Sequence, residues 1–287
     1  GDEEAATEWL RKQGIAAAAK KSGRDTSDGL VALLCNPQKS AATLLEVSSE
    51  TDFVARNETF QNIVTKLAEV ALAAKTTDIE SLKAVPYSDD ETAGEAMIRA
   101  TATIRENLAL KEVDFVEIKE GFGAIGMYIH NKRGDILGTQ ASLVAIESSE
   151  EMGEKELDSV QNLANSLAIH LVGAQAMYMN AIPQEVIDKE REILSEAAKK
   201  EMEENAQQNS KQVDEDVMAK RIKKKVDKRI SKLAEELVLE KQKFVSEGAD
   251  GKANVQAILN KTSKELGTTL KIKTALRYQI GNEKVEM

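Results

Sequence analysis

The sequence predicts an α+β fold: two related subdomains with small antiparallel sheets packed by helices, a protruding antiparallel helical coiled-coil hairpin and a short N-terminal helix. Three observations lead to this prediction. Aromatic residues are scarce, at 3% of 287 residues, and charged residues alternate with Ala, Leu and Val, which is typical of a helix-rich protein. A strand–turn–helix pattern occurs twice, and a long segment rich in Glu, Lys and Arg follows its second copy.

The repeat appears when the sequence is shifted by about one hundred positions. Ser48-Ser49-Glu50 then falls on Ser148-Ser149-Glu150. The apolar face of the helix after each turn matches in phase: Phe60 with Val160, Ile63 with Leu163, Val64 with Ala164, Leu67 with Leu167, and Ala71 with Leu171. The predicted domains are a helical remnant and linker at 1–28, a first subdomain at 29–135 and a second subdomain at 136–287.

The individual elements follow from periodicity and from turn residues. A short helix is expected at 2–12 and a loop at 23–29, before strands begin at 30–34 and 41–47. The remaining expected elements are helices at 58–74, 90–108 and 255–266, strands at 113–118, 123–130, 137–146 and 269–280, and the helix of the second copy, which runs through residue 171.

The charged segment at about 183–239 begins at Pro183, a residue favoured at the first position of a helix, and is interrupted by a polar turn at 207–211. It is therefore expected to form the two antiparallel helices of the hairpin. The predicted seam contains Ile187, Ile193, Leu194, Met202, Val213, Val217, Ile222, Val226 and Ile230. A solvated charged helix pair with no partner is an equally open interpretation.

The turn at 48–57 is the most informative segment, because it places Phe53 directly beside Asp52 between a strand and a helix. Asp52 and Asn57 are both plausible helix N-caps, so Phe53 is expected at the rim of the fold, where it can enter a partner. The alternative is that Phe53 is a buried staple against the next helix. The second copy has Gly153 at this position, which argues against a structural need for an aromatic ring.

Patterns that would support an enzyme are absent from the sequence. Residues 121–126 have the Gly-x-Gly-x-x-Gly spelling but continue as a strand rather than opening a helix, so a dinucleotide site is rejected. No Walker phosphate loop occurs, so no bound nucleotide is expected. His130 and His170 lack neighbouring ligands, and Cys35 is interpreted as a small buried hydrophobe.

The net charge of −10 argues against direct nucleic-acid binding, although the basic residues at 223–229 leave a local contact open. No apolar run has the length of a membrane span, so no membrane association is expected. A single cysteine indicates a reducing compartment.

The run Thr51-Asp52-Phe53-Val54-Ala55-Arg56-Asn57 closely resembles the signature of the elongation factor Ts family. Residues 104–107 resemble that family's Ile-Gly-Glu-Asn element, with Arg105 where Gly is usual, which puts a close backbone contact there in doubt. Residues 244–245 resemble a Pro-Phe-Val element, with Lys243 in place of Pro. The partner-binding residues that the resemblance implies are Thr51, Asp52, Phe53, Val54, Ile104, Asn107, His130, Phe244 and Val245.

The resemblance implies a guanine nucleotide exchange factor that acts on elongation factor Tu in protein biosynthesis, without a cofactor and without covalent catalysis. The competing hypothesis is a coiled-coil assembly or tethering protein that keeps the fold but lacks exchange activity. Residues 35–40 stand where bacterial members usually have a Gly-rich turn, so a mitochondrial or plastid location is predicted, with the bacterial cytoplasm as the alternative.

Overall fold

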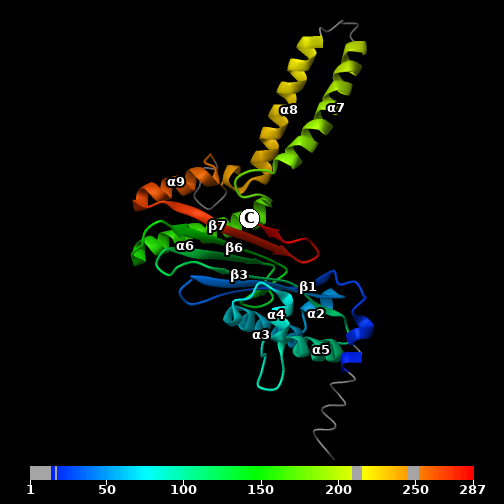
Figure 1. The fold of residues 1–287 in the computed structure, drawn as a ribbon, viewed down its shortest axis with the longest axis vertical. Coiled ribbons are helices and arrows are strands. Elements are labelled where there is room, and N and C mark those ends of the chain that lie inside the picture. The colour runs from blue at the N-terminus through cyan, green and yellow to red at the C-terminus, as the bar shows by residue number, and fades with distance from the viewer. Residues whose placement is uncertain (1–13, 17, 209–214, 245–251) are drawn as a thin grey trace, which may run out of the picture. The chain divides into compact units, whose positions relative to one another are not determined.

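The computed structural model describes residues 14–16, 18–208, 215–244 and 252–287 (Figure 1). The helix expected at 2–12 lies outside these residues. The chain divides into two compact units: one comprises Gly1–Gly173 with Asn260–Met287, and the other comprises Ala174–Leu259. Small antiparallel sheets and helices make up the first unit, which confirms the α+β class.

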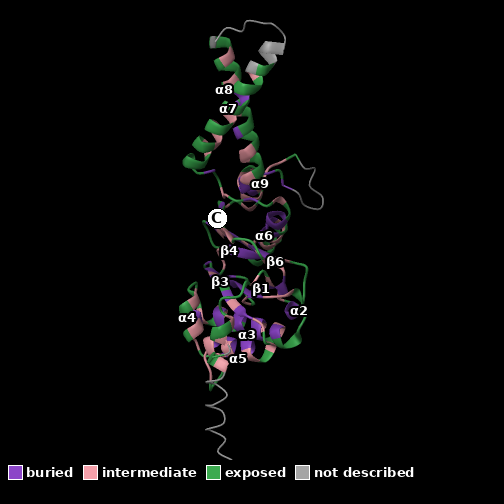
Figure 2. Cartoon of the chain, turned by 90° about the vertical axis from the view of Figure 1, so that its right-hand side faces the viewer, coloured by how far each residue is buried: buried purple, intermediate pink, exposed green. Residues whose placement is uncertain are grey.

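The first sheet of the larger unit has the order β3-β2-β1-β5, with every neighbouring pair antiparallel. Helices α2 to α5 pack on one of its faces, as the buried residues of the shared core show (Figure 2). The elements are β1 (Asp28–Cys35), β2 (Ala41–Ser49), α2 (Asp52–Ala55), α3 (Glu58–Ala74), α4 (Ile79–Ala84), α5 (Ala93–Ile104), β3 (Leu108–Glu117) and β5 (Leu137–Gly138).

The second sheet has the order β4-β6-β7-β8 and is also antiparallel. Its elements are β4 (Gly123–His130), β6 (Gln140–Ser148), α6 (Glu154–Ala174), α9 (Val255–Leu266), β7 (Leu270–Gln279) and β8 (Val285–Glu286). The two sheets pack face to face, because one core cluster takes Leu33 and Leu44 from the first sheet and Leu143 and Tyr278 from the second.

The repeat predicted from the sequence is present in the fold. Each sheet contains three neighbouring strands, β1, β2 and β3 or β4, β6 and β7, with helices in the chain between the second and third strands. The register of the second strand shifts near its end in both copies, between Glu46 and Val47 in β2 and, one position earlier in the alignment, between Ala145 and Ile146 in β6. The five matched helical pairs are buried in both copies.

The chain crosses between the sheets before the second copy is complete. Strand β4 precedes β5, yet β4 pairs with β6 in the second sheet and β5 pairs with β1 in the first. The subdomain boundary between residues 135 and 136 stays a prediction. The helix expected at 90–108 is shorter, because it ends at Ile104, where Arg105 turns left-handed.

The smaller unit is built around α7 (Gln184–Gln208) and α8 (Glu215–Leu237), which are followed by the 3₁₀ turn η1 (Leu239–Lys241). Ion pairs join Arg191 to Asp227 and Glu201 to Lys225, so residues later in α7 meet residues earlier in α8 and the helices are antiparallel. Ala198, Val226 and Ile230 are buried.

Two residues of the predicted seam do not belong to it. Ile193 and Val217 are 61% and 42% exposed, because a strict apolar spacing cannot be maintained on helices with so few apolar residues. Val213 lies outside the described residues. A continuous coiled-coil seam is therefore not established by these helices.

Candidate partner-binding site

Phe53 lies on the four-residue helix α2, immediately after the end of β2. Its side chain is 75% exposed, whereas the next two residues, Val54 and Ala55, are each only 5% exposed. The exposure rules out the buried staple and confirms that the ring lies at the rim of the fold. Val54 faces the core and fastens α2 to the sheet, so its side chain is not on the surface as a partner-binding residue would be.

The two predicted N-caps have different outcomes. The Asn57 side chain accepts a hydrogen bond from the Phe60 backbone N–H at 3.3 Å and caps α3, as expected. Asp52 is not a cap, because the N-cap position of α2 is Thr51 and Asp52 is the first helical residue. The Asp52 carboxylate instead accepts a hydrogen bond from Arg56 at 2.9 Å on the exposed side of the same turn.

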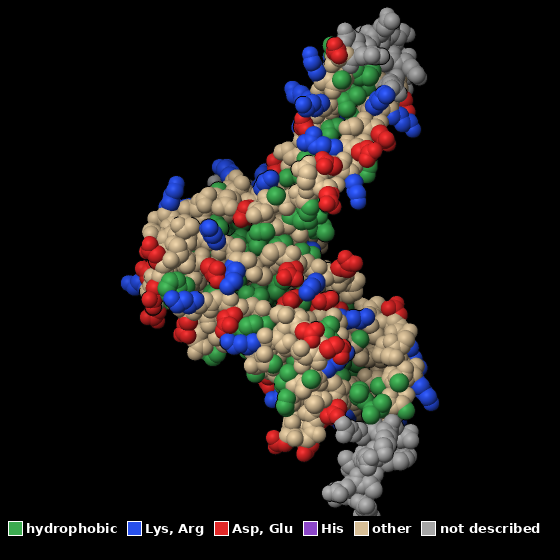
Figure 3. Space-filling view, viewed as in Figure 1, with side chains coloured by type: hydrophobic (Ala, Val, Ile, Leu, Met, Phe, Trp, Pro, Cys, Tyr) green, Lys and Arg blue, Asp and Glu red, His purple; other side chains and the backbone are tan. Residues whose placement is uncertain are grey.

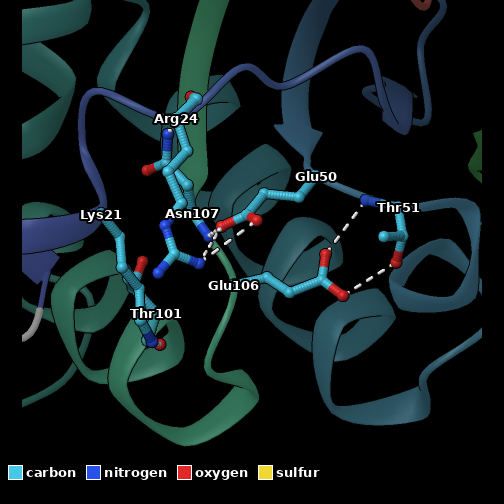
Figure 4. A network of polar contacts seen from close by, with 7 residues as sticks. All are labelled: Lys21, Arg24, Glu50, Thr51, Thr101, Glu106 and Asn107. Atoms are coloured by element: carbon cyan, nitrogen blue, oxygen red, sulfur yellow. Dashed lines mark hydrogen bonds and ion pairs between the residues drawn. The ribbon is translucent and has the colours of Figure 1, made fainter.

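A polar network fastens this turn to the end of α5 (Figure 4). The Glu106 carboxylate accepts hydrogen bonds from the backbone N–H of Thr51 at 3.0 Å and from its hydroxyl at 2.8 Å. The Glu50 carboxylate accepts the backbone N–H of Asn107 at 2.6 Å and also contacts Arg24 at 3.3 Å. The bond from Asn107, together with the Arg24 charge, lowers the pKa of Glu50.

Arg105 closes α5 in the left-handed region, with φ 65° and ψ 21°. Its backbone N–H donates to the Thr101 carbonyl at 3.0 Å, which is the hydrogen bond of a left-handed C-cap. Glycine is the residue that adopts this conformation without a steric cost. The backbone therefore keeps a glycine-like shape although the side chain is arginine. The Glu106 carboxylate then reaches Thr51, and the backbone N–H of Asn107 reaches Glu50.

The other residues predicted in this unit have mixed environments. Ile104 is half-buried against the first core. Asn107 is 7% exposed, and its side-chain amide donates to the Arg24 carbonyl at 2.8 Å, so its side chain serves the fold. His130 is exposed at the end of β4, where its Nδ1 lies 3.2 Å from the Tyr128 hydroxyl.

One hollow of about 240 Å³ brings the Phe53 turn together with the segment after His130. Asp52 of α2 and Arg56, which follows the helix, line it from one side, and Asn131 and Arg133 of the turn after β4 line it from another. The turn and His130 were predicted as parts of one partner-binding set, and the hollow lies between the turn and the segment that follows His130.

Phe244 belongs to the smaller unit and is only 5% exposed. Its backbone N–H donates to the Ala253 carbonyl at 2.9 Å. The ring is therefore buried, and it is not displayed for a partner as Phe53 is. Val245, the residue predicted beside it, lies outside the described residues.

Sequence reasoning missed Glu50 and Glu106. A signal was present, since Glu50 directly precedes the Thr51 signature and Glu106 stands between the two residues chosen at 104–107. Residues 51 and 106 are far apart in the chain, however, so their contact emerges only when β2 and β3 pair. The register of that pair brings Ser49 opposite Leu108.

Acidic and basic side chains are intermixed across the surface in view (Figure 3).

Within the described residues, His, Cys, Asp and Glu side chains nowhere form a group of three or more that could hold a metal ion. None of the helices in the described parts of the chain combines the length and apolar character needed to cross a bilayer. Burial is the main cause that raises the pKa of the Cys35 thiol.

The larger unit is thus an α+β fold with an exposed aromatic ring at the edge of its two-sheet core, beside a polar hollow. The family model described as elongation factor TS matches residues 50–282. The chain therefore belongs to the elongation factor Ts family, as its signature predicted, and that membership places it among the translation elongation factors.

Individual relatives agree along almost the whole chain. Elongation factor Ts from Rhodospirillum rubrum is 36% identical over 98% of this chain and 84% of its own length. Elongation factor Ts proteins from Rickettsia bellii and Rickettsia felis are 36% and 38% identical, each over 98% of this chain and 83% of their own length. These relatives are bacterial, so the predicted mitochondrial or plastid location receives no support from them.

Proposed function

We propose that this chain promotes the exchange of GDP for GTP on elongation factor Tu by inserting the Phe53 ring into the GTPase. The observation that carries the proposal is the 75% exposure of a phenylalanine whose helix is fastened to the core on its opposite side. An exposed aromatic ring is costly to keep in water, and it gains most when a partner covers it.

The mechanism is reciprocal coupling, without covalent chemistry and without a nucleotide or cofactor on this chain. If the factor weakens nucleotide binding, nucleotide weakens factor binding by the same free energy. A roughly hundredfold loss of nucleotide affinity corresponds to about 3 kcal/mol. Burying one Phe side chain contributes about 1.5–3 kcal/mol, so one inserted ring supplies a large part of that coupling. The inserted ring would weaken the hold on Mg²⁺ and phosphate.

The hollow beside Phe53 supplies the polar part of the same interface. Asp52 and Arg56 border it, and His130 ends the strand whose following hairpin forms the opposite border. Polar groups at such a rim fix the orientation of a partner, while the central aromatic residue provides most of the affinity. The bacterial relatives favour the cytoplasm of a bacterium as the compartment.

The test is the release rate of a fluorescent GDP analogue from elongation factor Tu, measured with the wild-type chain and with Phe53→Ala. Because Phe53 is exposed, the variant is expected to fold normally while losing about tenfold or more of the stimulation. Phe122→Ala is the matched control, since it removes a partly exposed ring at a distant turn and is expected to leave release unchanged. Binding without faster release by the wild-type chain would favour the assembly or tethering hypothesis.

A further inference from the structure

We infer that Glu106 is a positioning residue that fixes the orientation of the Phe53 turn. It acts through a carboxylate clasp, defined here as Glu50, Thr51, Glu106 and Asn107. The inference rests on the proposed function, because it assigns Glu106 to the site at which Phe53 meets the GTPase. Glu106 itself is half-buried, lies two residues beyond the end of α5 and acts through Thr51.

The clasp begins where the β2–β3 ladder ends. The last paired residues are Ser49 and Leu108, beyond which the two segments separate. The next backbone donors would lose their ladder partners there. Instead, the Glu106 carboxylate accepts the N–H of Thr51, and the Glu50 carboxylate accepts the N–H of Asn107. Each segment thus supplies a charged acceptor to the other, and such charge-assisted bonds are stronger than neutral ones.

Every polar atom of Thr51 makes a hydrogen bond. Because Thr51 directly precedes Asp52, the first residue of α2, holding Thr51 in place also fixes the orientation of that helix. The Thr51 N–H and hydroxyl donate to Glu106, and its carbonyl accepts the Ser49 hydroxyl at 3.0 Å and the Val54 N–H at 3.3 Å. A threonine at an N-cap normally accepts a hydrogen bond from the helix it precedes. Here the hydroxyl makes no such cap bond to α2 and is committed to Glu106.

In the second copy, the corresponding end of the β6–β7 pair is held together without carboxylates. Helix α9 ends at Leu266, and Gly267 takes the left-handed conformation that Arg105 has in the first copy. Thr268 then stands where Glu106 stands, and its hydroxyl lies 2.8 Å from that of Ser148. The Ser149 N–H also donates to the Thr269 carbonyl at 3.0 Å, so a backbone hydrogen bond and hydroxyl contacts join the two segments here. The carboxylate clasp accompanies only the copy whose turn carries an exposed aromatic ring.

The experiment combines Glu106→Ala with Phe53→Ala and measures stimulated GDP release from elongation factor Tu. If Glu106 acts by orienting Phe53, Glu106→Ala is expected to lower stimulation roughly tenfold in the wild-type background and to have no further effect in Phe53→Ala. Glu106→Gln is expected to restore most of the activity, since its carbonyl can accept the Thr51 N–H and its amide can donate to the hydroxyl. Glu120→Ala, which removes an exposed carboxylate elsewhere, is the control.

A second readout does not depend on exchange activity. Fluorophenylalanine at position 53 is expected to give one narrow ¹⁹F resonance in the wild-type chain and a broadened or shifted one in Glu106→Ala, with faster exchange of the Thr51 amide proton. An unchanged resonance and unchanged amide protection would overturn the inference, as would equal losses in both Phe53 backgrounds. If Phe53→Ala leaves GDP release intact, the proposed function fails, while the ¹⁹F measurement still decides whether Glu106 orients the turn.

Discussion

The two strand–turn–helix copies have the same framework but different turns. In the first copy, β2 ends at Ser49 and the long helix α3 starts at Glu58, with the short helix α2 between them. In the second copy, β6 ends at Ser148 and α6 starts at Glu154, with no helix between them. The buried helical faces match, whereas the turns share little beyond Ser-Ser-Glu. The sheet and its covering helix therefore determine the fold, and the turn is free to carry function.

The two copies are expected to differ most in the stability lost when a matched core residue is replaced by alanine. The positions compared are Phe60 and Val160, both fully buried. Phe60→Ala removes a whole ring from the first core and should lower the free energy of unfolding by about 3–5 kcal/mol. Val160→Ala removes two methyl groups and should cost about 2 kcal/mol. Urea unfolding followed by circular dichroism measures both changes.

Phe53→Ala is the control for ring size, since it removes the same side chain from an exposed position and should change unfolding by less than about 0.5 kcal/mol. A loss at Phe53 as large as that at Phe60 would contradict the division between a core ring and a partner-facing ring. Equal losses at Phe60 and Val160 would show that the first core relaxes around the cavity.

A smaller change in the free energy of unfolding is expected when the left-handed residues that follow α5 and α9 are substituted. Arg105 and Gly267 occupy corresponding left-handed positions, with φ 65° and φ 69°. Arg105→Gly should raise the free energy of unfolding by about 0.5–1 kcal/mol, because glycine adopts this conformation without the steric cost of a Cβ atom, although it also gains freedom when unfolded. The urea midpoint of the variant reports the gain.

The reverse substitution tests the same explanation. A Cβ atom at Gly267 would meet no heavy atom within 4 Å, so Gly267→Arg should lose stability through backbone conformation alone, by a similar amount. If Arg105→Gly were destabilising, the Arg105 side chain would have to contribute contacts that outweigh its conformational cost.

Elements with a long apolar period were predictable from the sequence. The predicted helices at 58–74 and 255–266 and the strand at 123–130 have the observed bounds. Helix α5 begins at Ala93 rather than residue 90, because Thr92 and Glu95 form a capping box that the sequence displays. Its end at Ile104 was not predictable, since nothing in an arginine indicates a left-handed conformation. Helix α2 has only four residues, too few to show a period.

The candidate site was predictable to the extent that it is local. The exposure of Phe53 followed from its position beside helix caps and from Gly153 in the second copy. The burial of Val54 and Asn107 did not, because it depends on how α2 and β3 pack. Glu106 reaches Thr51 only through the pairing of β2 with β3, and no local pattern shows such a contact.

The smallest expected effect is a pH dependence confined to the first copy, whose corner contains carboxylates. The Asn107 N–H lowers the pKa of Glu50 in the folded chain, so its contribution to stability is present above the ordinary pKa and is lost as the pH falls through the lowered value. Glu50→Gln should therefore be less stable than wild type near neutral pH and match it in strong acid.

Burial raises the pKa of Glu46, so Glu46→Gln should show the opposite trend: its stability relative to wild type should increase as the pH rises. Urea midpoints measured between about pH 3 and pH 7 compare the two. Parallel trends in both variants would contradict the assignment of hydrogen bonding to Glu50 and desolvation to Glu46.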